Sequence, residues 1–125
     1  DKIFLVAPSS TDARIAMTTQ ACRGFVYATA VMGVTGARTT TSDLAGPLVA
    51  RTRASLTEQQ SDLPVGVGLG VSNGEQAAEV ASYADAVIVG SAFVRTLLDA
   101  QGDRAVGLAA LRALTEDLAG GVRRA

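Results

Sequence analysis

Short apolar runs alternate along this chain with longer stretches in which apolar residues recur at helical spacing. The apolar runs are continuous and do not alternate with polar residues, which is typical of parallel strands that are covered on both faces. The pattern predicts four strands, over Ile3–Ala7, Phe25–Ala30, Val65–Leu69 and Ala86–Val89.

Helical spacing and capping residues predict helices between and after these strands. The second of them carries Leu44, Leu48, Val49 and Leu56 on one side, and Pro47, which a helix tolerates in its first turn, favours a start slightly later than Ser42. Gly120–Gly121 is expected to end the last one. The predicted helices run from a cap at Ser10 or Thr11 to about Cys22, from about Ser42 through Leu56, from Ser72–Glu75 to Tyr83, over Ser91–Leu98 and over Ala105–Leu118.

Strands that alternate with helices indicate an α/β fold with a parallel sheet, in which right-handed crossovers place every strand-to-helix loop at one edge. We interpret residues 1–125 as one domain made of four βα units of a parallel (β/α)8 TIM-type barrel. A closed barrel needs roughly 200 residues or more, so the chain corresponds to half of one. Three arrangements remain open: part of a longer chain, a dimer that closes a barrel, or a small open α/β sheet.

Glycine-rich runs follow three of the predicted strands, at Gly33–Arg38, Val65–Gly70 and Val87–Ala92. Backbone N–H groups at such positions can reach an anion because no Cβ is in the way. The last two runs fall where a (β/α) barrel commonly builds its phosphate site. The run at Gly33–Arg38, within a long polar loop over Val31–Ser42, suits a lid that closes over a substrate.

The composition excludes several other classes of function. The chain has no histidine and one cysteine, Cys22, so neither a Ser–His or Cys–His catalytic pair nor a thiol metal site is available within it. A net charge of −1 gives no basic patch for nucleic acid. No apolar run reaches the roughly 20 residues of a membrane helix, and the start shows no signal-peptide pattern, so a cytoplasmic setting is expected.

Several motifs together resemble the C-terminal half of the tryptophan synthase alpha subunit. GVTGAR followed by VGxGxx and VGSA is specific to that family, and the match spans essentially the whole chain in order and spacing. The motifs are FLVAP at 4–8, RGFVY at 23–27, GVTGAR at 33–38, DLPVGVGLGV at 62–71, EQAAEVA at 75–81 and AVIVGSAFV at 86–94.

The resemblance implies a barrel enzyme that cleaves indole-3-glycerol phosphate to indole and glyceraldehyde 3-phosphate, and a pyridoxal-phosphate beta subunit as partner. This chain would itself carry no cofactor. The family's phosphate-binding amides correspond to Gly36, Gly70, Gly90 and Ser91. Two further positions match residues with supporting catalytic roles: Tyr27 an active-site tyrosine, and Thr35 a loop threonine that organises the catalytic carboxylate.

The family's catalytic glutamate and aspartate lie on earlier strands that are not in this sequence. Its acidic residues at Asp12, Asp43, Glu75 and Asp85 are explained by capping at helix starts and turns. The first hypothesis is therefore the phosphate half of a retro-aldol lyase. The alternative is a half-barrel that binds phosphate or a phosphosugar without catalysis, as a homodimer. A third option, another phosphate-binding barrel enzyme, is disfavoured by GVTGAR.

Some positions depart from the family pattern, and others have a structural interpretation. Leu69 stands where the family often has phenylalanine, and Val31–Met32 where it often has polar residues, so both affect the expected indole pocket. Cys22 is interpreted as a structural thiol. Arg51 and Arg53 are expected on an outer helix face.

Overall fold

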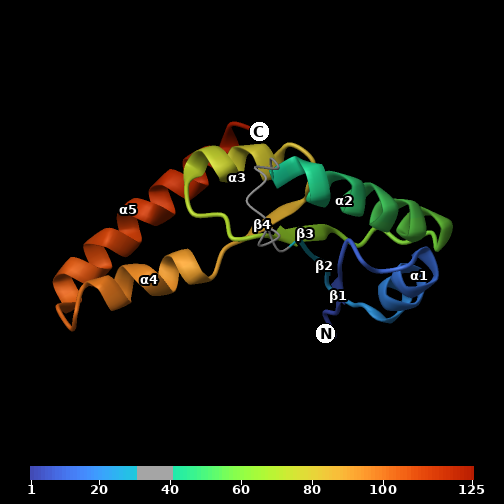
Figure 1. Ribbon diagram of the computed structural model, residues 1–125, viewed down its shortest axis with the longest axis horizontal. Coiled ribbons are helices and arrows are strands. Elements are labelled where there is room, and N and C mark those ends of the chain that lie inside the picture. Colours follow the sequence, from blue (N-terminus) through green and yellow to red (C-terminus); the bar gives the residue numbers. More distant parts are fainter. Residues whose placement is uncertain (31–40) are drawn as a thin grey trace.

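The computed structural model describes residues 1–30 and 41–125 and consists of a small parallel sheet with helices along it (Figure 1). Strands and helices alternate, as predicted, up to a final pair of helices. In chain order the elements are β1 (Leu5–Val6), α1 (Asp12–Ala21), β2 (Val26–Thr29), α2 (Thr41–Glu58), β3 (Val65–Gly68), α3 (Gly74–Ala81), β4 (Ala86–Ile88), α4 (Ser91–Asp99) and α5 (Arg104–Arg123).

The sheet has the strand order β1-β2-β3-β4, and each neighbouring pair is parallel. Tyr27 pairs with Gly66 and Thr29 with Gly68, which fixes the register of the two central strands. β1 and β4 are the edge strands of this sheet. The α/β class and the four βα units are thus confirmed, with each strand shorter than its predicted range.

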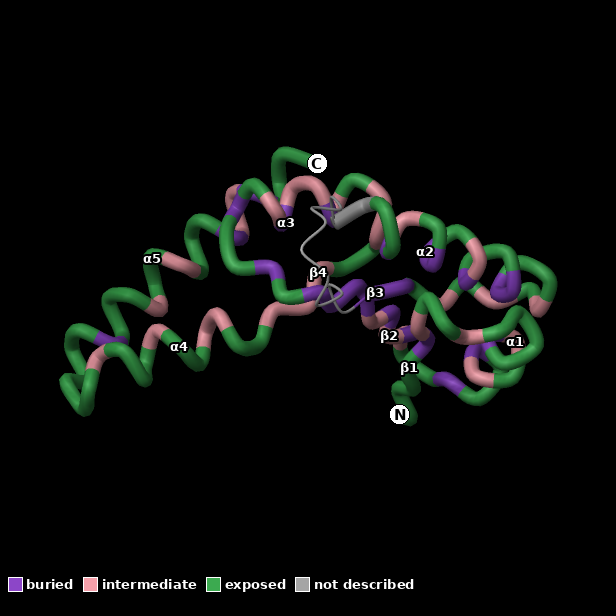
Figure 2. Tube along the Cα trace, in the orientation of Figure 1, coloured by how far each residue is buried: buried purple, intermediate pink, exposed green. Residues whose placement is uncertain are grey.

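One face of the sheet is packed against helices and forms the core. Val26 and Ala28 on β2, with Val65 and Val67 on β3, are completely buried. Figure 2 shows buried positions concentrated in the strands and on the inner sides of α1, α2 and α3, whereas α4 and much of α5 are exposed. Along β2 the buried residues alternate with half-buried ones, so Tyr27 and Thr29 point to the other face.

The start of α2 differs from the prediction. The helix begins at Thr41, and Pro47 lies inside it. A proline there removes one backbone hydrogen bond, but Ala45, Leu48 and Val49 are all buried, and this packing keeps the helix continuous. Leu44, expected on the inner side, is 37% exposed.

The end of α5 also corrects the prediction, because the helix continues through Gly120–Gly121 to Arg123. Gly121 faces α3 so closely that an added Cβ would collide with the backbone carbonyl of Gly74. The Asp117 carboxylate accepts a hydrogen bond of 2.8 Å from the Gly74 N–H. Glycine at 121 therefore permits a close helix contact and does not terminate the helix.

Asp85 ties together the starts of β3 and β4. Its Oδ2 accepts a 2.9 Å hydrogen bond from the Val65 N–H, and its Oδ1 lies 3.1 Å from Nη2 of Arg53 on α2. The Val65 N–H, followed by Arg53, holds the pKa of this carboxyl below the ordinary value of 3.8, although partial burial opposes the shift.

We expect Gly121→Ala to lower the free energy of unfolding by about 2 kcal/mol or more, because backbone must move to admit the methyl group. Gly120→Ala is the matched control, since a Cβ there meets only the end of Arg124 at 3.8 Å. That change should stabilise the helix by about 0.5–1 kcal/mol. Urea unfolding of both variants checks the prediction, and equal effects at the two positions would contradict it.

We expect Asp85→Asn to reduce stability at neutral pH but not in acid. A carboxyl whose folded pKa is depressed contributes stability above its unfolded pKa and loses that contribution as the pH falls through the folded pKa. The stability difference between parent and variant should therefore be constant from pH 7 to about pH 5 and shrink below pH 3.8. Urea unfolding at several pH values measures it, and a difference that persists unchanged in acid would refute the assignment.

Candidate functional site

A cleft of about 970 Å³ opens at the edge of the sheet where the strands end and the helices begin. Its wall comes from β2 and β4, from the end of β3 and the loop after it, and from one side each of α4 and α5. Parallel strands place these segments together although they are far apart in sequence. The residues that line it include Tyr27, Thr29, Gly68, Leu69, Gly70, Val71, Ser72, Ile88, Gly90, Ser91, Arg95 and Asp99.

Gly70 turns the chain directly after β3. Its φ of +86° lies in the left-handed region, which side chains rarely adopt, and a Cβ there would meet open space. The backbone is therefore accessible from the cleft at this position.

Gly90 and Ser91 form the N-terminus of α4 on the same cleft. The N–H groups of Phe93 and Val94 both donate to the Gly90 carbonyl, and Gly90 supplies no side-chain cap. The amides of the first helical turn precede those donors and have no acceptor within the helix. Together with the helix dipole, they make this part of the cleft favourable for an anion.

Tyr27 projects from β2 across the open face of the sheet. A Cβ built on Gly68 would lie 2.5 Å from the Tyr27 hydroxyl oxygen. Gly68 is therefore needed because the tyrosine ring packs over it, and the ring and hydroxyl line the cleft. Leu69, at 9% exposure, is part of the core and of the same wall.

The structure thus brings four of the predicted site residues, Tyr27, Gly70, Gly90 and Ser91, to one cleft. Their assigned roles stay predictions. The two others, Thr35 and Gly36, lie outside the described residues, as do the rest of the GVTGAR run and Val31–Met32.

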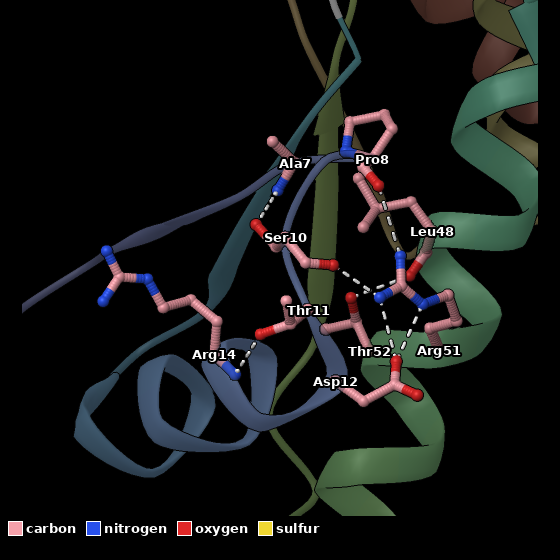
Figure 3. Close-up of polar contacts among 9 residues, drawn as sticks. All are labelled: Ala7, Pro8, Ser10, Thr11, Asp12, Arg14, Leu48, Arg51 and Thr52. Carbon is pink, nitrogen blue, oxygen red and sulfur yellow. Dashed lines mark hydrogen bonds and ion pairs between the residues drawn. The ribbon is translucent and has the colours of Figure 1, made fainter.

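Arg51 on α2 holds the loop that follows β1, a role that the sequence did not indicate. Its Nε and Nη2 both lie 2.9 Å from Oδ1 of Asp12. Nη2 also donates to the Ser10 carbonyl and Nη1, at 3.4 Å, to that of Pro8. Figure 3 shows the guanidinium pointing from α2 into this loop.

The same loop is also held from within. The Ser10 hydroxyl accepts a 3.0 Å hydrogen bond from the Ala7 N–H, and the Thr11 hydroxyl caps α1 by accepting from the Arg14 N–H (Figure 3). Thr11 is thus the cap, as one of the two predicted alternatives. Arg51 and Arg53, expected on an outer helix face, each pair with an aspartate far away in sequence.

Metal-ligating clusters and membrane-spanning helices are both absent from the described part of the chain. Within residues 1–30 and 41–125, no three His, Cys, Asp or Glu side chains gather closely enough to hold a metal ion. Among the same residues, no helix combines the length and apolarity needed to cross a membrane. Cys22 is completely buried, and its Sγ accepts a hydrogen bond from the Phe4 N–H.

Comparison with known proteins gives a consistent result. The family model of the tryptophan synthase alpha chain matches residues 1–123. The alpha chain of Acidothermus cellulolyticus is 66% identical over 124 residues, which cover 99% of this chain and 43% of that protein. The alpha chain of Mycobacterium intracellulare is 60% identical over 124 residues, covering 99% and 42%. The chain thus spans less than half of the length of these curated relatives.

Solved structures agree. Tryptophan synthase from Mycobacterium tuberculosis, in an open form, matches with a TM-score of 0.79 and 50% identity, over 100% of this chain and 41% of the matched chain. The neighbouring alpha chains are TIM barrels, so the interpretation of the fold as part of such a barrel is confirmed.

We expect Arg51→Met to loosen the loop after β1 selectively. The matched control is Arg53→Met, which removes an arginine–aspartate pair from the same helix but at the opposite edge of the sheet, beside Asp85. Amide hydrogen exchange at Ser10 and Arg14 should become about tenfold or more faster in Arg51→Met than in the parent or the control. Arg51→Lys should not restore slow exchange, because an ammonium cannot reproduce the forked contacts. Equal exchange in the two methionine variants would contradict the role.

Proposed function

Because the chain belongs to the tryptophan synthase alpha chain family, we propose that it supplies the phosphate-binding part of a lyase. That enzyme cleaves indole-3-glycerol phosphate to indole and glyceraldehyde 3-phosphate in tryptophan biosynthesis. The observation that carries the proposal is the cleft itself, where the backbone at Gly70 and the first turn of α4 at Gly90–Ser91 face the same space.

In the proposed reaction, the described residues bind and orient the substrate. The amides at Gly70, Gly90 and Ser91 hold the phosphate through hydrogen bonds and the helix dipole. Anchoring the non-reacting end places the indole ring and the scissile carbon–carbon bond at a fixed position. Tyr27 borders the space between this anchor and the open face of the sheet.

The acid–base chemistry of the proposal needs two carboxylates from outside this chain. One would protonate indole C3, and the other would stabilise the resulting cationic ring at the indole nitrogen. The first, now a carboxylate, would then take the proton of the hydroxyl on the carbon attached to C3. As that carbon–carbon bond breaks, its electrons return to the indole ring and the hydroxyl carbon becomes the aldehyde of glyceraldehyde 3-phosphate. Both carboxylates would come from the part of the relatives that this chain does not span. Gly36 would add a phosphate contact, Thr35 would orient a carboxylate, and closure of the 31–42 segment would exclude water.

The same proposal includes a partner and a setting. Indole released at the alpha site would pass to a beta subunit that carries pyridoxal phosphate, in a cytoplasmic heterotetramer. The alpha chain would need no cofactor or metal of its own, because proton transfer and phosphate binding suffice for a retro-aldol cleavage.

A half-barrel that binds phosphate without catalysis is the second candidate. The exposure of Ile3 and Phe4, which precede the edge strand β1, and of Leu5 within it, at 40%, 42% and 58%, favours it. Apolar side chains beside an unpaired edge promote association with a second copy. The two candidates differ in whether binding is accompanied by indole release.

We expect Ser91→Asp to weaken phosphate binding at least about tenfold, because a carboxylate at the helix start would repel the anion and occupy the amides. Ser91→Ala is the control and should bind within about threefold of the parent, since the backbone amides remain. Calorimetric titration with glycerol 3-phosphate measures this, on the 125-residue chain and on the complete product of its gene.

Indole release from indole-3-glycerol phosphate by that complete product, lost in Ser91→Asp and retained in Ser91→Ala, would support the lyase. Binding without release would favour the second candidate. An absence of binding in the parent protein would refute both.

A further inference from the structure

Besides the backbone amides, the cleft contains a positively charged side chain that the proposed function does not use. Arg95 and Asp99 are the charged residues among the described residues that line it. Both lie on α4, the helix whose first turn carries Gly90 and Ser91.

The lining positions of α4 form one face of the helix. Ala92, Arg95, Thr96, Asp99 and Ala100 recur at intervals of three and four residues, which places them in line along the helix. Arg95 follows Ser91 by four positions, so it lies one turn further along the same face. Long side chains on helices point back toward the N-terminus. Arg95 is exposed and lines the cleft, and this preference favours a side chain that reaches toward the end of the cleft where the free amides lie.

No acidic group neutralises Arg95 within the described part of the chain. The ion pairs between described residues are Arg51–Asp12 and Arg53–Asp85. Asp99 follows Arg95 by four positions but does not pair with it, and an arginine that precedes its acid is the less favourable order on a helix. The guanidinium therefore keeps its donors available for a ligand.

We propose that Arg95 is a specificity-determining residue of the phosphate site, which contacts the bound phosphate from the α4 side and favours dianionic phosphate monoesters. This inference rests on the proposed phosphate site. Neutral amides supply direction but only partial charge, whereas a guanidinium offers a full charge and a planar pair of donors that match phosphate oxygens. Recognition should consequently depend on ligand charge and on ionic strength.

The test compares Arg95→Gln and Arg95→Lys with Arg112→Gln. Arg112 is an exposed arginine on the neighbouring helix α5, outside the residues that line the cleft, so its removal changes the net charge by the same amount. Each variant is titrated calorimetrically with glycerol 3-phosphate and with inorganic phosphate, at low salt and at about 0.3 M salt, in a buffer without other multivalent anions.

We expect Arg95→Gln to weaken binding about three- to tenfold at low salt, with a smaller loss at high salt. Arg95→Lys should recover part of the loss, and Arg112→Gln should stay within about twofold of the parent. The affinity ratio between pH 7.5 and pH 5.5 should fall in Arg95→Gln, because its site discriminates less between the dianion and the monoanion.

Two outcomes would overturn the inference, and they are distinguishable. If the parent binds phosphate and Ser91→Asp does not, but Arg95→Gln binds like the parent at both salt concentrations, Arg95 has no role and the proposed function stands. If the parent binds no phosphate, the proposed function and the role of Arg95 fail together. An equal loss in Arg95→Gln and Arg112→Gln would reduce the effect to net charge and also refute a contact.

Discussion

The contact between α5 and the first turn of α3 is the interaction on which the cleft depends. Gly121 lies against the Gly74 backbone, where a residue with a Cβ would not fit, and the Asp117 carboxylate accepts a hydrogen bond from the Gly74 N–H. α5 is thereby held against the sheet-bound part of the molecule. Since the start of α4 is joined to the end of β4 and the rest of α4 packs on α5, this contact sets the direction in which α4 lies beside the cleft. The proposed phosphate site therefore depends on helix packing that lies outside its own motif.

α2 is held against the sheet by a second set of contacts. Two arginines on this helix reach opposite edges: Arg51 binds the loop after β1, and Arg53 binds Asp85 at the start of β4. Both pairs are partly exposed and each contributes little to global stability. Their effect is on position, because together they fix where α2 lies along the direction of the strands.

Much of this arrangement could be predicted from local pattern. The strand around Val65–Gly68 and the helix start at Asn73–Gly74 follow from apolar continuity and capping chemistry, and both are observed. The continuation of α5 past Gly120–Gly121 could not be predicted, because a glycine that ends a helix and one that permits close packing look alike in sequence. The same holds for Arg51, whose partner Asp12 lies 39 positions away. Gly68 shows a related limit. It belongs to a glycine-rich run that resembles a phosphate-binding loop, but the structure explains this glycine by the Tyr27 ring that packs over it.

The docking of the α4–α5 hairpin has a thermodynamic consequence for ligand binding. A ligand that contacts Gly70 on one wall and Gly90–Ser91 on the other binds only while the two walls are held together. By mass action, such a ligand stabilises the docked hairpin by as much as docking improves the affinity for the ligand. α4 and α5 pack on each other and α5 packs on α3, but much of the apolar surface of this hairpin stays exposed. Ligand binding and docking of the hairpin are then thermodynamically coupled. A bound phosphate would therefore protect this largely exposed hairpin from local unfolding more than it protects the buried core.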